Sequence, residues 1–486
     1  MGDSTKLVKN SALYTIGNVL IKAFSFLLIP IYTSYLSTAD YGITNLVSGF
    51  TALFSCIITL SLQYAVIRFY ADMKTNQDDV AKLYGTVINF VSVFGIVLSL
   101  ILIAAKSQWT DLFYRNVPFV PIVLLSIFIS VVSALYTLYQ DILKGMQDAK
   151  RSVVLSFVFF FLLLISNIIA IVFLKKGALG MVWATLVVNF IMVIYMMIDL
   201  GKRNLYKLCF DVHLIKGLLR YSLPLVPHTL SYNLTFYVTR VLINAKLSLS
   251  ALGLFSLASQ FGYVSDIILN SFQSAFQPWM FEMMGKDDEE SRERIRKSTY
   301  SLAWIMGIIY LLVGTFSQEA IYIMADSSYW SAWKYVPCLV FSVALKSPLY
   351  YYTNFLYYDK SKTKYIFIAT FIACVINVVL TWLCIPLYGI YGSILADILS
   401  MIVRVIITIR VSWKLANGIY SLFKLFMIST IPMMFLFASI FPSYIFFNEE
   451  ISVSMFSYKL FMITLYIALA FYLNKSIIKN IRFSKI

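Results

Sequence analysis

Long apolar stretches recur along almost the whole chain, from Ser11 to Leu473, and each covers about 18 residues or more. A helix of about 20 residues crosses a hydrocarbon core about 30 Å thick, because each residue adds about 1.5 Å. Inside lipid every backbone N–H and C=O group needs an internal partner, and a helix supplies them all. With 60% apolar and only 13% charged residues, the chain is predicted to be an all-α polytopic membrane protein.

The apolar stretches divide the chain into fourteen expected transmembrane helices. They cover residues 10–36, 41–70, 81–105, 117–142, 152–174, 178–200, 217–244, 251–282, 296–317, 334–358, 363–386, 388–411, 418–441 and 455–474. We expect an N-terminal six-helix lobe over 1–203 and a C-terminal six-helix lobe over 204–414. Residues 415–486 are expected to form two extra transmembrane helices and a basic cytoplasmic tail.

The distribution of basic residues sets the expected orientation. The net charge is +16, and with the N-terminus inside, 28 of the 39 Lys and Arg residues fall on the cytoplasmic side and 7 on the other. This asymmetry follows the positive-inside rule, so we predict a multi-pass protein with both termini in the cytoplasm. Membrane topology explains why the basic residues gather in the loops of one side. The positive net charge therefore does not indicate nucleic acid binding, and we expect no nucleic acid partner.

An internal duplication becomes visible when the chain is compared with itself at a shift of about 211 residues. Residues 36–50 match 247–261 at six positions, including Gly42 with Gly253. Residues 177–185 match 389–397 at a nearly equal shift, with Gly177 over Gly389. The repeat unit holds six spans, an even number, so both copies enter the membrane from the same side. We therefore expect two bundles related by a pseudo-two-fold axis along the membrane normal, with the substrate site between them.

Polar residues at helical spacing mark the faces of four expected spans that avoid lipid. Span one carries Asn18 and Lys22, and span seven carries His228 and Asn233. In span eight, polar positions follow one another every three or four residues: Ser259, Tyr263, Asp266, Asn270, Gln273 and Gln277. Span two has only Ser and Thr on its stripe, and there helix packing with backbone hydrogen bonds remains an equal alternative.

Cations inside the spans are the most informative single residues, because each costs about 2.5–3.5 kcal/mol at a helix centre. Lys22 and Lys346 lie near the middle of their spans, Arg240 lies nearer the outer end, and Arg404 nearer the inner end. For Arg240, a structural role as an anchor at the membrane interface remains an alternative to substrate binding. For Asp397 and Arg404, the alternative is a structural ion pair that acts through a third group. An excess of buried positive charge would favour an anionic headgroup such as a lipid diphosphate.

The residues that carry chemistry resemble those of a known family. RYSLPLVPHTLSYN (220–233), ALGLFSLASQFG (251–262), SLQYAVIRFYAD (61–72) and the repeated glycine pair Gly177/Gly180 and Gly389/Gly392 are similar to the polysaccharide-transporter (Wzx-like) flippases of the multidrug/oligosaccharidyl-lipid/polysaccharide exporter superfamily. The resemblance covers essentially the whole chain. It implies two six-helix bundles around a cationic cavity. Family members often have an Asp-Arg pair where this chain has Thr239 and Arg240, so no acidic role is carried over there.

The resemblance implies a flippase, not an enzyme, in the bacterial cytoplasmic (inner) membrane. Its expected substrate is an undecaprenyl-diphosphate-linked oligosaccharide repeat unit for O-antigen of lipopolysaccharide, capsule or exopolysaccharide, with an H+ or Na+ gradient as the driving force and no cofactor or metal. A polysaccharide polymerase and a chain-length regulator are expected partners besides membrane lipid. Candidate substrate-binding residues are Lys22, Asn18, Arg240, Lys346, Arg404, His228, Asn233, Asn270 and Gln273, and candidate ion-coupling residues are Asp266 and Asp397.

Two other functions remain open at this stage. A multidrug/cation antiporter on the same scaffold would prefer a net acidic cavity, which these residues do not form. A membrane glycan polymerase or ligase would need catalytic groups in an outer loop. The longest expected outer loops, 318–333 and 442–454, offer only Glu319, Asp326, Glu449 and Glu450, and no catalytic arrangement is visible among them.

Overall fold

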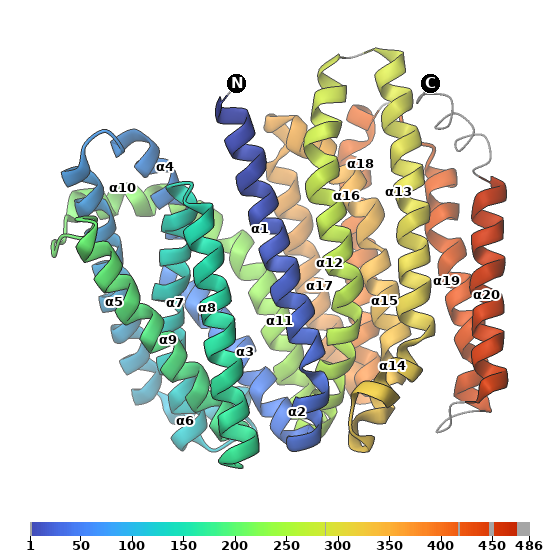
Figure 1. Cartoon of the computed structure of the whole chain (residues 1–486), viewed down its shortest axis with the longest axis horizontal. Helices are drawn as coiled ribbons and strands as arrows, with labels where there is room; N and C mark the ends of the chain where they lie inside the picture. The colour runs from blue at the N-terminus through green and yellow to red at the C-terminus, as the bar shows by residue number, and fades with distance from the viewer. Residues whose placement is uncertain (1, 287, 417, 447–451, 474–486) are drawn as a thin grey trace. The chain divides into compact units, whose positions relative to one another are not determined.

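The computed structural model describes residues 2–286, 288–416, 418–446 and 452–473, and within these ranges every regular element is a helix. The prediction of an all-α multi-pass membrane protein is confirmed. The chain divides into two compact units, Met1–Gly253 (unit 1) and Leu254–Ile486 (unit 2). Figure 1 colours the helices along the chain.

Unit 1 is built around α3, which packs along α7 on one side and along α11 on the other. The helix α1 packs on α8, and α7 packs on α9. The helices of this unit are α1 (Gly2–Leu27), α2 (Ile29–Tyr35), α3 (Thr38–Thr59), α4 (Leu62–Met73), α5 (Gln77–Ala104), α6 (Lys106–Phe113), α7 (Leu124–Gly145), α8 (Ala149–Ile168), α9 (Gly177–Lys202), α10 (Val212–Ser222) and α11 (Val226–Lys246).

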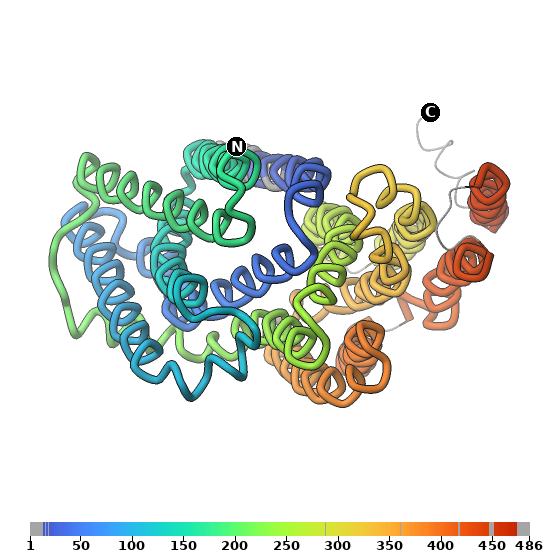
Figure 2. Tube along the Cα trace, turned by 90° about the horizontal axis from the view of Figure 1, so that it is seen from below, coloured from blue at the N-terminus to red at the C-terminus, as the bar shows by residue number. Residues whose placement is uncertain are grey.

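Unit 2 begins within α12, which starts in unit 1. Its α17 and α18 form a long antiparallel pair (Figure 2), α13 packs on α19, and α19 packs on α20. The helices are α12 (Leu249–Lys286), α13 (Glu289–Thr315), α14 (Ser317–Met324), α15 (Val336–Ala344), α16 (Lys346–Tyr358), α17 (Lys364–Tyr388), α18 (Ile390–Ala416), α19 (Leu422–Ile445) and α20 (Val453–Leu473).

Ten helices of the described chain are long and apolar enough to cross a membrane. Three other expected spans are broken into shorter helices: the first at Leu28, the seventh by a 3-10 turn at Leu223–Leu225, and the tenth at Leu345. Pro30 and Pro224 stand at the first two of these breaks, where a residue without a backbone N–H is tolerated. The expected outer loop 318–333 is also largely helical, because α14 and a 3-10 segment, Ser327–Tyr335, occupy it.

The glycines of the duplication adopt matching backbone conformations. Gly177 precedes the main body of α9 with φ +51°, and Gly389 precedes α18 with φ +57°. A positive φ is readily adopted only by glycine, so the repeated residue meets the same conformational demand twice. Gly180 and Gly392 are each crowded by the end of the preceding helical segment: a Cβ there would lie 3.0 Å from Ala170 Cβ and 2.3 Å from the Cys384 carbonyl oxygen, respectively.

The compact units and the predicted lobes divide the chain at different residues. The duplication predicts a lobe boundary after Arg203, whereas the compact units meet after Gly253. Unit 1 extends further because α10 packs on α4 and α11 packs along α3. The compact units reflect how the helices pack, whereas the predicted lobes reflect sequence repetition. The six-helix lobe boundary therefore stays a prediction.

Candidate functional site

An ion pair inside unit 2 is the centre of the candidate site. Lys346, the first residue of α16, donates a hydrogen bond of 2.9 Å from Nζ to Oδ1 of Asp266 on α12. Their side chains are 23% and 20% exposed, so both charges are largely withdrawn from solvent. The two residues lie 80 positions apart in the sequence. The ion pair joins Lys346, which was predicted to bind substrate, to Asp266, which was predicted to take part in ion coupling.

Two further polar contacts join the same pair of helices. The Tyr350 hydroxyl donates to Oδ1 of Asn270 at 2.9 Å, and Nε2 of Gln273 donates to Oδ1 of Asn354 at 2.5 Å. Residue numbers rise in the same order on both helices, so α12 and α16 run parallel along this contact. Parallel directions are what the span count predicts, because spans eight and ten cross the membrane in the same sense. We call these three contacts the polar ladder.

Helical geometry explains why these side chains meet. Residues Asp266, Asn270 and Gln273 recur at four and three positions, which places them on one face of α12. Lys346, Tyr350 and Asn354 recur every four residues on α16 in the same way. The polar stripe predicted on span eight is therefore matched by a second stripe on span ten, of which the sequence analysis identified only Lys346.

The helix α18 adds a carboxylate and a guanidinium group beside the polar ladder. Asp397 accepts a hydrogen bond from the hydroxyl of Ser342 on α15, and it interacts electrostatically with Lys346. Arg404 interacts electrostatically with Tyr350 and Tyr357. Asp397 therefore interacts with Ser342 and Lys346, whereas Arg404 interacts with tyrosines of α16.

Charge is balanced around the ladder in unit 2. Lys346 and Arg404 contribute two positive charges, and Asp266 and Asp397 contribute two negative charges. The expected excess of positive charge is therefore not found among these four residues, because the carboxylate of Asp266 lies directly on the Lys346 ammonium group. An anionic ligand that binds Lys346 must compete with that carboxylate.

Arg240 occupies a buried position in unit 1 and is 4% exposed. Its Nη1 donates 2.9 Å to the carbonyl oxygen of Phe236, and its guanidinium carbon lies 3.4 Å from the centre of the Phe236 ring. Gly49 on α3 leaves room for it, since a Cβ there would come within 3.2 Å of Arg240 Cδ. The side chain packs between α11 and α3 and donates to a carbonyl oxygen of its own helix. Arg240 is therefore a buried, packed cation and not an anchor that reaches the membrane interface.

The remaining candidates of unit 1 lie on α1 and α11. Lys22 is exposed on α1, and Asn18 lies on the same helix but its side chain falls outside the described part. His228 is exposed near the start of α11. Asn233 donates 3.0 Å to the Thr229 carbonyl oxygen and lines a cavity of unit 1.

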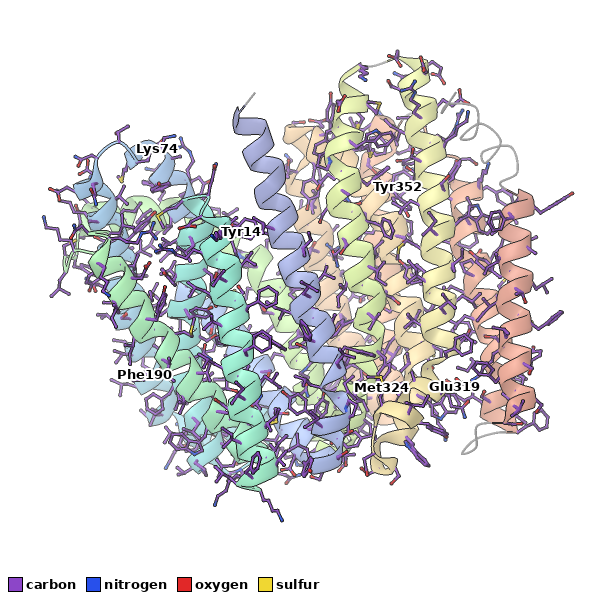
Figure 3. The ribbon with its side chains drawn as sticks, viewed as in Figure 1. Tyr14, Lys74, Phe190, Glu319, Met324 and Tyr352 are labelled. Carbon is purple, nitrogen blue, oxygen red and sulfur yellow. The ribbon has the colours of Figure 1, made fainter. Side chains whose placement is uncertain are left out.

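A second buried ion pair was missed by sequence reasoning. Lys459 on α20 is fully buried and donates 2.7 Å to Glu319 Oε1 on α14 and 3.2 Å to Gln318 Oε1. Both charges had been assigned to outer segments of the chain. Figure 3 labels Glu319 low in the view and Tyr352 of α16 well above it.

The fold and the polar ladder define a class: a multi-pass helical membrane protein with charged groups held inside its helices' contacts. A comparison with protein families extends this class. The profile of a family described as polysaccharide biosynthesis protein matches residues 7–284, more than half of the chain. The chain belongs to the polysaccharide biosynthesis protein family.

Individual proteins similar to this chain agree with that membership. Protein 1 of the Lsg locus of Haemophilus influenzae is 24% identical over 414 residues, which cover 80% of this chain and 96% of the relative. The lipid II flippase MurJ in an inward closed conformation matches 97% of this chain and 100% of its own, with a TM-score of 0.71 and 14% identity. An inward-facing multidrug resistance MATE family transporter of the MOP superfamily matches 83% and 99%, with a TM-score of 0.64 and 14% identity.

Proposed function

We propose that the chain is a flippase for undecaprenyl-diphosphate-linked oligosaccharide repeat units, which it moves from the cytoplasmic to the outer leaflet by alternating access. The observation that carries the proposal is the Lys346–Asp266 pair at the start of the polar ladder, largely withdrawn from solvent inside unit 2. Membership in the polysaccharide biosynthesis protein family, shown by the match over residues 7–284, supports a role of the chain in polysaccharide biosynthesis. The product would supply O-antigen, capsule or exopolysaccharide assembly, in the bacterial cytoplasmic membrane with both termini in the cytoplasm.

A diphosphate fits the chemistry of this site. Its oxygens accept charge-assisted hydrogen bonds, and Lys346 presents an ammonium group with three donors. The ladder adds the Tyr350 hydroxyl and the amides of Asn270 and Gln273, which suit sugar hydroxyls. A cation exporter would use an acidic excess, and the paired charges of unit 2 do not provide one.

Ion coupling is proposed at Asp266 or Asp397. When a phosphate takes Lys346, the Asp266 carboxylate loses its partner, and an unpaired charge in this environment is unfavourable. Uptake of H+ or Na+ relieves it, so ligand binding and cation binding at the site are linked. We propose this gradient as the energy source, without a cofactor or catalytic chemistry, and with the polymerase and chain-length regulator as later partners in assembly.

The test is transport by the purified full-length protein in proteoliposomes that contain a fluorescent undecaprenyl-diphosphate-linked oligosaccharide. Wild-type protein is expected to expose the glycan to an external lectin. Lys346→Met should abolish this exposure, whereas Lys346→Arg, which keeps the charge, should retain part of it. Equal rates for the two variants, or no glycan exposure by wild-type protein under any H+ or Na+ gradient, would contradict the proposal.

Coupling has its own measurement in the same vesicles. Asp266→Asn and Asp397→Asn are expected to make transport insensitive to the imposed gradient. Transport that stays fully gradient-dependent after both substitutions are combined would remove these residues from the coupling role and leave the substrate assignment untouched.

A further inference from the structure

A polar cavity of about 300 Å³ lies inside unit 1, bounded by α3, α4, α7 and α11. Its polar lining includes Ser55, Thr59, Gln63, Thr137, Asp141 and Asn233. A volume of this size is at the lower end of the range for small-molecule sites. Of these residues only Asn233 belongs to the predicted site.

The cavity adjoins a strained break between α3 and α4. Leu60 and Ser61 follow one another with φ +46° and +57°, in the left-handed region that residues with side chains rarely adopt. Thr59 precedes the break and Gln63 follows it, and both line the cavity. Strained backbone persists where the surroundings fix it, and it concentrates at ligand sites.

Contacts with α11, across the cavity, hold this break in place. The Ser61 hydroxyl hydrogen-bonds the Thr229 hydroxyl of α11 at 2.8 Å, and Asn233 bonds the Thr229 carbonyl oxygen at 3.0 Å. These contacts hold Asn233, which lines the cavity, through its amide nitrogen. Within the part of the chain that the structure describes, the Gln63 amide and the Thr137 hydroxyl have no hydrogen-bond partner.

The lining excludes several kinds of ligand. No Lys or Arg contributes to it, and Asp141 would repel a phosphate. Asp141 is itself paired with Lys144 at 2.8 Å, so its carboxylate is a poor single anchor for a metal ion. In the described residues, no group of three or more His, Cys, Asp or Glu side chains is placed to hold a metal. Amides and hydroxyls on an apolar frame suit an uncharged ligand with many hydroxyl groups.

We propose that this cavity binds an uncharged sugar of the glycan portion of the substrate and thereby selects among glycans. The inference rests on the proposed flippase function and deepens it. In this cavity, Gln63, Thr137 and Asn233 contact that sugar. Hydroxyl groups of the sugar donate to Asn233 Oδ1 and to Asp141, and the Gln63 amide donates to sugar oxygens.

The experiment compares two ligands on the full-length protein in nanodiscs: undecaprenyl diphosphate alone and the same lipid carrying the repeat unit of the source strain. Wild-type protein should bind the glycan-bearing lipid about tenfold or more tightly, since each sugar hydrogen bond contributes a few-fold. Gln63→Leu and Thr137→Val should remove most of this difference while leaving affinity for the bare lipid unchanged. Thr235→Val, on α11 but not in the cavity lining, serves as the matched control.

Each outcome has a distinct meaning. If wild-type protein binds neither lipid, the flippase function itself fails. If wild-type protein prefers the glycan-bearing lipid but the cavity variants keep that preference in full, or if it binds both lipids equally, the sugar site is overturned and the cavity holds water only. Equal losses for Thr235→Val and Thr137→Val would also overturn the assignment, because the effect would then not come from the cavity.

Discussion

Gly42 and Gly253 pack reciprocally, each against the backbone of the helix that carries the other. A Cβ added to Gly42 would lie 2.1 Å from the carbonyl oxygen of Leu249, and one added to Gly253 would lie 1.9 Å from that of Thr38. The duplication aligns Gly42 with Gly253 and also Thr38 with Leu249 at the same shift. Contacts that exchange equivalent residues in this way are the mark of a two-fold relationship. The first turns of α3 and α12 therefore meet as symmetric partners.

Gly42→Ala and Gly253→Ala are each expected to destabilise the protein by about 1–3 kcal/mol or more, because the added methyl overlaps a carbonyl oxygen that cannot move independently of its helix. The two losses should be similar, since the two sites are equivalent. Thermal unfolding of purified protein in detergent measures them.

Gly201→Ala is the control for this pair, because a Cβ on Gly201 would meet no atom within 4 Å. Its stability should stay within about 0.5 kcal/mol of the wild-type value. A tolerated alanine at Gly42 alongside a disruptive one at Gly253 would show that the contact is not symmetric.

The Lys346–Asp266 pair predicts a specific pattern of single and double variants. Lys346→Met or Asp266→Asn alone should cost about 1–3 kcal/mol, less than a fully buried pair because about a fifth of each side chain is exposed. The double variant should recover most of that loss, since neither charge is left without a partner. Thermal unfolding of the four proteins gives the coupling free energy, and additive losses would argue against a direct interaction.

Sequence reasoning could place helices and polar faces, but it could not supply their partners. The three- and four-residue spacing of Asp266, Asn270 and Gln273 predicts one face of a helix because that spacing is set by local geometry. The identity of the opposing residues depends on which helices pack together, and a single sequence carries no record of contacts 80 positions apart. The matching Tyr350 and Asn354 were therefore not among the predicted site residues.

Position along the chain also did not reveal that Lys459 and Glu319 form a buried pair. A lysine close to the start of an apolar stretch is normally an interface residue, and Glu319 follows a span end. The structure instead folds residues after Thr315 into α14, which carries Glu319 back against α20. The break at Leu60 and Ser61 was missed for a related reason: neither residue is Gly or Pro, so no local signal marks it.

Lys22→Ala is expected to abolish glycan export while the protein still inserts in the membrane. Lys22 lies on the polar stripe of α1, and its side chain is exposed in the structure. Surface polysaccharide of cells that carry only this variant measures export, and membrane abundance of the protein measures insertion. Lys22→Arg should retain export, and normal polysaccharide with Lys22→Ala would exclude the residue from the site.

The Lys459–Glu319 pair should govern how firmly α20 is held on unit 2. Lys459→Met leaves the Glu319 carboxylate buried without its counter-charge, and its Oε2 already has no hydrogen-bond partner in the described residues. Removing one member of such a pair costs about 3–5 kcal/mol, whereas replacing both by apolar side chains is nearly neutral. Thermal unfolding should thus show a large loss for Lys459→Met and for Glu319→Gln a smaller one, because a neutral amide still accepts from Lys459. The double variant Lys459→Met with Glu319→Leu should restore stability. If glycan export also returns in this variant, the pair only holds α20 on unit 2 and takes no part in transport.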